Sequence, residues 1–226
     1  MLRLALAALV VGACAPGVEE LPSTLAPGAA GARYGRLHKF RVLATAAPVQ
    51  IRRDLTLKEV SHLPGAAERG LKTQGVTTIK HSLATHTRFS TTKGGGSVYA
   101  WFDDVILEVS VASTVIHIPS EYAPGSCEYA VVLEHERRHG LAAREQAAAF
   151  AAKLERALST SEGLPTRFNP VIAPNFDAAA EVLKAAVAKV VDPVYDRYEK
   201  DEKEAQDALD RPDPYDAVYR KCGGWR

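Results

Sequence analysis

The spacing of hydrophobic residues changes once along the chain, from a period of two to a helical period. Within residues 105–111 every second residue is Val or Leu, which is typical of a half-buried strand. The segments 40–51, 76–89, 98–102 and 114–118 are also β-prone, and the glycines of residues 93–97 predict a turn. We therefore expect residues 37–119 to form a mixed or antiparallel sheet.

The second part, residues 120–226, is predicted to be helical. Pro124 and Gly125 break the preceding structure, Ser126 is a suitable N-cap, and Ala, Glu, Arg and Leu dominate up to residue 158. Asn175 is expected to cap another helix that extends to residue 191, with Pro193 interrupting it before residues 195–209 resume the helix. The predicted fold class is α+β, in a single domain over residues 37–226.

Composition narrows the class of protein. The chain has 226 residues, with 28 Lys and Arg against 27 Asp and Glu and 46% hydrophobic residues, as in an ordinary globular protein. A formal net charge of +1 argues against a nucleic-acid partner, because phosphate binding needs a clustered excess of basic residues. Residues 15–226 contain no run near the roughly 18 apolar residues of a transmembrane helix, which excludes a polytopic membrane protein.

The first residues resemble a bacterial lipoprotein signal peptide. Arg3 precedes an apolar run over residues 4–11, and small residues stand directly before Cys14. We expect residues 1–13 to be removed, Cys14 to be lipidated and residues 14–36 to act as a flexible tether. The protein would then be anchored in the cell envelope on the periplasmic side, and Ala15 favours the outer membrane. The alternative is an ordinary secretory signal in which Cys14 is incidental.

Cys127 and Cys222 are the two other cysteines of the chain. In an oxidising compartment an even pair favours a disulfide, which would fasten the C-terminal region to the segment before residue 135. Two independent buried thiols are the alternative.

The candidate chemistry lies on the first long helix, in the sequence His135-Glu136-Arg137-Arg138-His139. Residues four apart share a helix face, so His135 and His139 can bind one zinc ion. Glu136 lies beside that face and could act as general base toward a water molecule. These are the parts of a metal-assisted amide hydrolase. The alternative is a surface helix with solvated ion pairs and two idle histidines.

This pattern resembles the zincin peptidases and, more narrowly, an uncharacterised bacterial family of predicted periplasmic zinc proteases. The resemblance implies a zincin-like α+β fold in which a sheet edge above the active-site helix pairs with an extended substrate. The residues that carry it are Ile118, Pro119, Tyr122, Gly125, Ser126, Cys127, Tyr129, His135, Glu136, His139, Ala208, Leu209, Asp210, Tyr215 and Cys222.

A catalytic zinc site needs a third protein ligand. Glu145 has the offset used by metzincins, but Ala142 stands where their helix-breaking glycine would be, so a continuous helix turns Glu145 away. In gluzincins the third ligand is a carboxylate from a later helix, which points to the acidic run over residues 192–202. Glu199 is the first choice and Asp196 the second. The alternative is that this acidic run forms a solvent-exposed, charged helix face and binds no metal.

Other polar residues give weaker signals. His81 and His86 are five apart in an expected strand, so they face opposite sides and do not suit a shared ion. His117 is expected to be a packed or exposed histidine, and Asp103 and Asp104 suggest a turn.

The sequence therefore predicts a membrane-anchored zinc metallopeptidase that hydrolyses peptide bonds in the cell envelope. Its expected cofactor is zinc, and its expected partners are a peptide or protein substrate and the membrane through the lipid anchor. The alternative is a catalytically inactive zincin-fold lipoprotein that acts as a binding or structural module.

Overall fold

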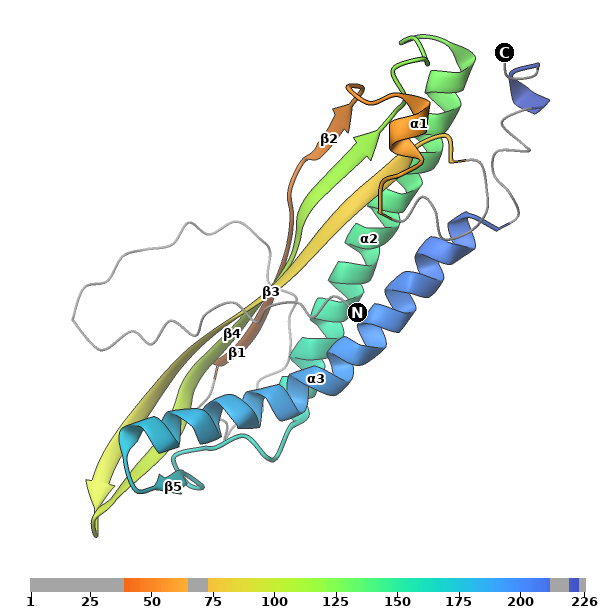
Figure 1. Ribbon diagram of the computed structural model, residues 1–226. Coiled ribbons are helices and arrows are strands. Elements are labelled where there is room, and N and C mark those ends of the chain that lie inside the picture. Colours follow the sequence, from red (N-terminus) through yellow and green to blue (C-terminus); the bar gives the residue numbers. More distant parts are fainter. Residues whose placement is uncertain (1–38, 65–72, 212–219, 224–226) are drawn as a thin grey trace.

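The computed structural model describes residues 39–64, 73–211 and 220–223, and its fold is α+β (Figure 1). The predicted signal peptide, the lipidation site Cys14 and the tether lie outside the described residues. Among the described residues, no helix combines the length and the apolar character that crossing a membrane requires.

One long strand, β4 (Ser97–His117), organises the whole sheet. It pairs antiparallel along its length with β3 (Val76–Gly94), and the two form a hairpin. Gly95 and Gly96 make the turn with φ angles of 58° and 80°, a region that glycine adopts without strain. The segments 98–102 and 105–111 and residues 114–117 are thus parts of a single strand rather than separate ones, and Ile118 directly follows it.

Three short strands share the other side of β4. From one end to the other these are β5 (Val171–Ala173), which is antiparallel, then β1 (Lys39–Ala46) and β2 (Val49–Arg52), which are both parallel to β4. The sheet is therefore mixed, as predicted. Two details differ from the prediction: residues 40–51 form two strands, and β5 lies in the part expected to be helical.

Two helices of 34 residues follow the hairpin, α2 (Cys127–Thr160) and α3 (Phe176–Leu209). Their predicted N-caps are confirmed. The side chain of Ser126 accepts a hydrogen bond from the Tyr129 backbone N–H, and that of Asn175 accepts one from Ala178. A single turn of helix, α1 (Leu57–Val60), follows β2 and was not predicted.

Pro193 does not interrupt the last helix, so that prediction was wrong. Pro193 stands in the middle of α3, which continues from Phe176 to Leu209. A proline removes one backbone hydrogen bond and bends a helix, and Figure 1 shows that α3 changes direction about midway. Apolar packing compensates for the lost bond, because Val187 and Val191 before the proline and Tyr198 after it are all buried.

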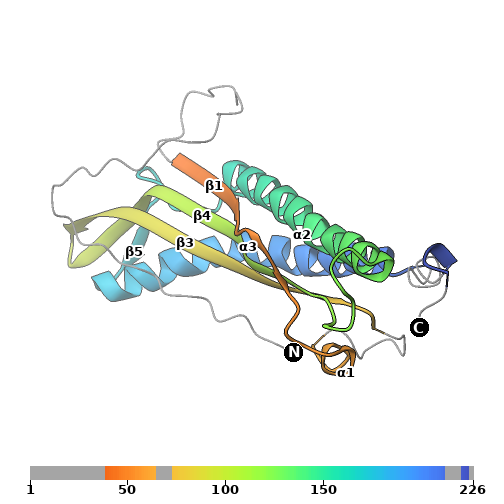
Figure 2. The ribbon, with the colours of Figure 1, turned by 90° about the horizontal axis from the view of Figure 1, so that it is seen from above.

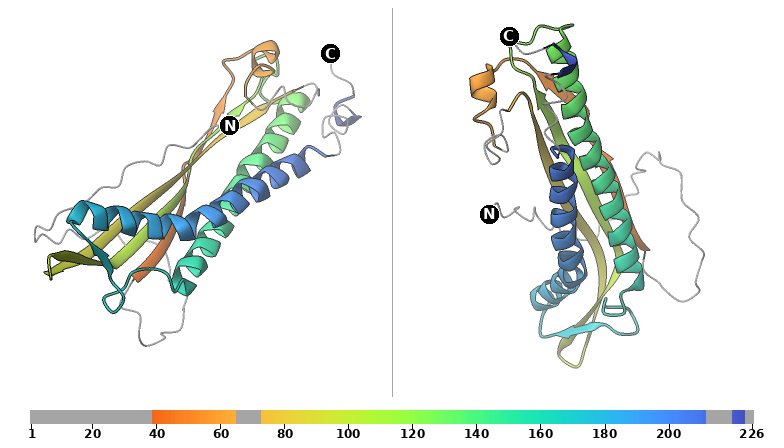
Figure 3. Two further views of the ribbon diagram at one scale, coloured as in Figure 1. Left: turned by 60° about the horizontal axis from the view of Figure 1, so that its bottom comes forward. Right: turned by 90° about the vertical axis from the view of Figure 1, so that its right-hand side faces the viewer.

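The two long helices cover the same face of the sheet (Figures 2 and 3). Alternate residues of β4 supply the sheet side of the core, and small and large apolar residues of both helices supply the other side. The helices pack antiparallel: the Phe150 ring of α2 stacks on Tyr198 of α3 at 4.5 Å, whereas His139 of α2 meets Gln206, closer to the end of α3. This register brings the C-terminal end of α3 to the first turns of α2.

A disulfide joins Cys127, the first residue of α2, to Cys222, with a Cα–Cα distance of 5.7 Å. This is the pairing that the sequence predicted. It fastens the C-terminal segment beside the helix that carries the two motif histidines.

Candidate metal centre

The two motif histidines lie on the inner face of α2. His135 and His139 are one turn apart, and His135 is 6% exposed. Val132 and Leu133, on the turn before them, pack with Ile118 in a small apolar cluster. The packing of this turn fixes the rotation of the helix, and with it the direction of both imidazole rings.

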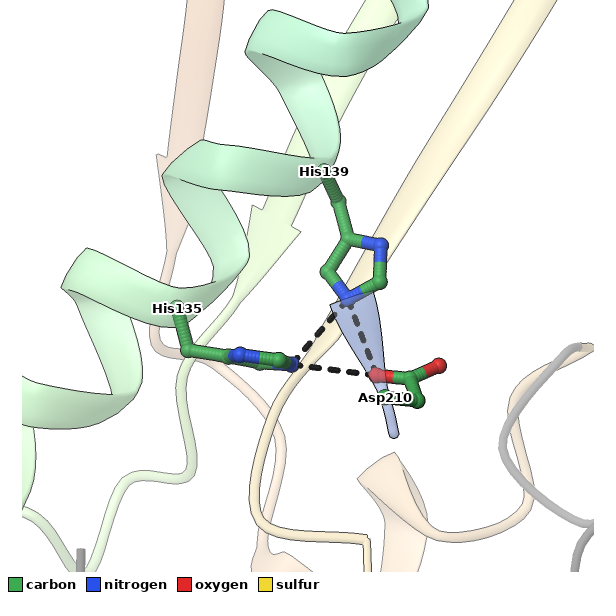
Figure 4. A group of neighbouring side chains, drawn as sticks. All are labelled: His135, His139 and Asp210. Carbon is green, nitrogen blue, oxygen red and sulfur yellow. Dashed lines mark hydrogen bonds and ion pairs between the residues drawn. The ribbon is translucent and has the colours of Figure 1, made fainter. Parts of the chain in front are cut away.

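The third residue of the group is Asp210, the C-cap of α3. Its Oδ1 atom lies 3.2 Å from Nε2 of His135 and 3.1 Å from Nε2 of His139, and the two nitrogens are 3.0 Å apart (Figure 4). The three atoms form a nearly equilateral triangle. Each comes from a side chain that commonly binds metal ions.

The triangle fits a zinc ion. Ligand atoms bound to tetrahedral zinc at about 2.0 to 2.1 Å lie about 3.3 Å from one another, close to the separations of the three atoms. Lone pairs that converge on one point also repel one another unless protons or a metal ion neutralise them. Two histidines and a carboxylate are a known ligand set for catalytic zinc, with one position left for water or substrate.

Glu136 lies beside this group and is buried, with 2% of its surface exposed. The hydroxyl of Thr77, at the start of β3, donates to the Glu136 carboxylate with an Oγ1–Oε2 distance of 2.7 Å. Gly75 allows the close approach, because a Cβ there would lie 2.5 Å from Val132 and 3.0 Å from Oε1 of Glu136. Thr77 in β3 and Gly75 just before this strand therefore lie against the predicted general base.

The electrostatics of the group favour positive charge at its centre. Burial by itself lowers the pKa of His139, but the hydrogen bond with Asp210, the charge of Glu136 and the contact with Gln206 outweigh it. The pKa of His139 is therefore raised above its usual value. A site that favours a proton on this ring also favours a metal cation in its place.

The structure does not bring the predicted third ligands, Glu199 and Asp196, to the histidines. Both are exposed, and Glu199 interacts with Tyr195. Glu199 precedes Asp210 by eleven residues, which is about 16 Å along a helix axis. The antiparallel register explains the correction, since it places the middle of α3 beside Phe150 and its end beside His135 and His139.

Asp210 was missed, although the sequence contained a signal for it. In an antiparallel pair of helices joined by a disulfide, residues at similar distances from the bridge come to lie opposite each other. His135 is eight residues after Cys127, and Asp210 is twelve before Cys222, whereas Glu199 is twenty-three before it.

The remaining polar candidates lie apart from this group. Glu145 is exposed on α2 and His86 is exposed on β3. Burial lowers the pKa of His117, which faces Asp54 and Arg52 at the end of the sheet. Asp103 and Asp104 are within β4 rather than in a turn. His81 contacts α3 instead, through Tyr198 and Glu202.

Comparisons of the chain with protein-family models, with curated proteins and with solved structures find no match.

Proposed function

We propose that the protein is a zinc-dependent hydrolase of peptide bonds, with His135, His139 and Asp210 as the metal ligands. The convergence of the two Nε2 atoms and Oδ1 within 3.0 to 3.2 Å of one another carries this proposal. Asp210 takes the place that the sequence gave to Glu199 or Asp196. A zinc ion held by these atoms would polarise a substrate carbonyl and lower the pKa of a water molecule to about 7.

Glu136 is the proposed general base. Its carboxylate would accept a proton from the attacking water and return it to the leaving nitrogen as the C–N bond breaks, so that peptide and water become a carboxylic acid and an amine. Burial and the Thr77 hydroxyl support this role, because they hold the carboxylate in one orientation next to the histidines. Holding a catalytic carboxylate in a productive orientation lowers the barrier to such a proton transfer.

The proposal extends to a zincin-like fold and an extended substrate. Among the described residues, β3 pairs with β4 and with no other strand, so its second edge has no strand partner there. β3 also begins at the residues that contact Glu136. A peptide that added a strand along this edge would lead its backbone past the proposed metal site.

Metal analysis and mutagenesis test the proposal. The purified chain should hold about one zinc ion, and Ala substitutions of His135, His139 or Asp210 should each remove most of it. Glu136→Gln should keep the zinc and lose the cleavage of an unbiased peptide library, whereas Glu199→Ala should change neither. Sub-stoichiometric zinc that is insensitive to both histidine substitutions would refute the proposed zinc-dependent activity. Stoichiometric zinc without cleavage would favour the inactive binding module.

We also propose that the enzyme acts in the cell envelope, tethered through Cys14. The apolar run over residues 4–11 and the small residues before Cys14 support this location. The intact mass of the protein from native membranes tests it, since lipidation at Cys14 removes residues 1–13 and adds acyl chains. A chain that begins elsewhere with an unmodified residue would refute the tether.

A further inference from the structure

His139 has a second polar contact, on the side of its ring that faces away from the metal group. Its Nδ1 atom is hydrogen-bonded to Oε1 of Gln206, which lies on α3 one turn before Asp210. An amide oxygen can only accept a hydrogen bond, so Nδ1 must carry the proton in this contact. The neutral ring then presents the lone pair of Nε2 toward Asp210 and His135.

The orientation of the Gln206 amide follows from its other partners. Nε2 of Gln206 lies 3.3 Å from the backbone oxygen of His139 and 3.1 Å from Oε1 of Glu202. Both partners are acceptors, so the NH2 group must point toward them. Flipping the amide would lose both of these hydrogen bonds and would direct NH2 at the Nδ1–H of His139.

Glu202 is held in turn from the sheet. Its Oε1 atom lies 3.7 Å from Nε2 of His81, a residue of β3, and Nδ1 of His81 is hydrogen-bonded to the Tyr198 hydroxyl at 2.9 Å. Tyr198, Glu202, Gln206 and Asp210 are spaced by four residues, so they form one row along α3. This row connects His81, in the first half of β3, to the proposed ligands.

We infer that Gln206 is a positioning residue of the metal site, which holds His139 as the Nδ1–H tautomer with Nε2 free for the ion, while Glu202 and His81 orient Gln206. The inference rests on the proposed zinc site. Partners of this type fix the orientation and the basicity of a ligating imidazole, and their loss usually lowers metal affinity about 10 to 100-fold. Gln206 carries no charge, so it adds no further anion to the two histidines and one carboxylate.

Removing the amide tests the role of Gln206. Gln206→Met keeps the length of the side chain and abolishes both hydrogen-bonding functions, and we expect it to weaken zinc binding about 10 to 100-fold, measured by competition with a chromophoric chelator. The absorption spectrum of bound Co²⁺ should change as well, because the His139 ring loses its fixed orientation. Glu199→Gln, an exposed change on the same helix, is the matched control and should leave both readouts unchanged.

A conservative change at Glu202 separates positioning from general packing. In Glu202→Gln the side-chain amide oxygen can still accept from Nε2 of Gln206, whereas Glu202→Met removes this acceptor. We expect Glu202→Gln to retain zinc affinity within about 10-fold of the original chain with the same Co²⁺ spectrum, and Glu202→Met to bind zinc more weakly and to change the spectrum. In the zinc-loaded protein, the nitrogen resonances of His139 should report a proton on Nδ1 in the original chain and in Glu202→Gln.

The outcomes distinguish this inference from the proposed function. If the original chain binds zinc at His135 and His139 but Gln206→Met binds it equally well with the same Co²⁺ spectrum, the positioning role is wrong and the zinc site stands. If the original chain binds no zinc, both the positioning role of Gln206 and the proposed zinc site are refuted. Should Gln206→Met fail to fold, as judged by circular dichroism, the nitrogen resonances of the zinc-loaded original chain decide: a proton on Nε2 of His139, with Nδ1 bound to the ion, overturns the inference.

Discussion

Gly75, directly before β3, lets the chain approach α2 closely. A Cβ atom at this position would lie 2.5 Å from Cγ1 of Val132 and 3.0 Å from Oε1 of Glu136. We therefore predict that Gly75→Ala lowers the free energy of unfolding by about 1 to 3 kcal/mol, since overpacking in a well-packed region costs about this much. Urea denaturation measures it. The displaced Glu136 should also lower any peptidase activity.

Gly94→Ala is the matched control for this substitution. Gly94 is the last residue of β3, and a Cβ there would meet only Cε2 of Tyr99 at an ordinary 3.5 Å. We expect a change within about 0.5 kcal/mol. Equal effects at the two glycines would contradict the tight approach of Gly75 to Val132 and Glu136.

Tyr122 should make stability depend on alkaline pH. Burial raises the pKa of this phenol to about 12, with smaller contributions from Glu121 and Glu128, and its hydroxyl donates a hydrogen bond to Gln74. In the unfolded chain the phenol ionises near its ordinary pKa of about 10. The folded state therefore retains a proton that the unfolded state loses, and stability falls as pH rises from about 10 to about 12.

Substitution by phenylalanine isolates this contribution. Tyr122→Phe removes the titrating group, so the free energy of unfolding should fall less steeply between pH 10 and 12 than in the original chain, although Tyr195 and Tyr198 still contribute in the same direction. Urea denaturation at several pH values measures the slope. An unchanged slope would show that Tyr122 titrates alike in the folded and unfolded states.

At the scale of the elements, the antiparallel register of α2 and α3 decides which acid reaches the histidines. Phe150 is buried at the centre of this interface, with its ring stacked on Tyr198 and at an angle to Tyr195. Phe150→Ala should lower the free energy of unfolding by about 3 to 5 kcal/mol, because it opens a large cavity. Zinc affinity should fall too, since the same interface holds Asp210 against α2.

The same substitution at an exposed phenylalanine provides the comparison. Phe168 is 84% exposed, so Phe168→Ala should change stability by no more than about 0.5 kcal/mol and leave zinc affinity unaltered. If Phe150→Ala destabilises the fold but zinc affinity persists unchanged, the register is not maintained by this contact.

Elements with strong local signals could be predicted from the sequence, and those that depend on distant packing could not. Ser126 and Asn175 start the two long helices because each accepts a hydrogen bond from a backbone N–H three residues later. β5 has three residues and forms through pairing with Val98 to Ala100 of β4, so its own sequence carries too short a pattern. Pro193 is tolerated within α3 because its neighbours are buried against the rest of the protein, and helix propensity, which depends on local sequence, does not account for such packing.

The same distinction applies to the site. His135, Glu136 and His139 could be predicted because one helical turn sets their spacing. Asp210 depends on how α2 and α3 slide past each other, which is a property of the whole interface. The acidic residues around Glu199 gave a denser local signal, but density of charge does not determine which turn of α3 meets the histidines.

At the scale of the whole molecule, the disulfide ties the C-terminal segment to α2, the helix that carries His135 and His139. Asp210 is the C-cap of α3, and the bridged Cys222 follows it twelve residues later, so we expect the bridge to limit how far the end of α3 can move from α2. The bridge joins residues 95 positions apart, for which chain entropy predicts a stabilisation of about 4 to 5 kcal/mol at most. Cys222→Ser should therefore lower both the free energy of unfolding and the affinity for zinc.

Chemical reduction provides an independent version of the same change. Treating the original chain with a phosphine reductant, which does not introduce competing thiols, should lower zinc affinity to the level of Cys222→Ser, and the reductant should have no further effect on that variant. The proposed zinc ligands are unchanged in both cases, so any loss of affinity would report the freedom gained by Asp210. Equal zinc affinity in the bridged and reduced chains would mean that α3 alone holds Asp210 in place.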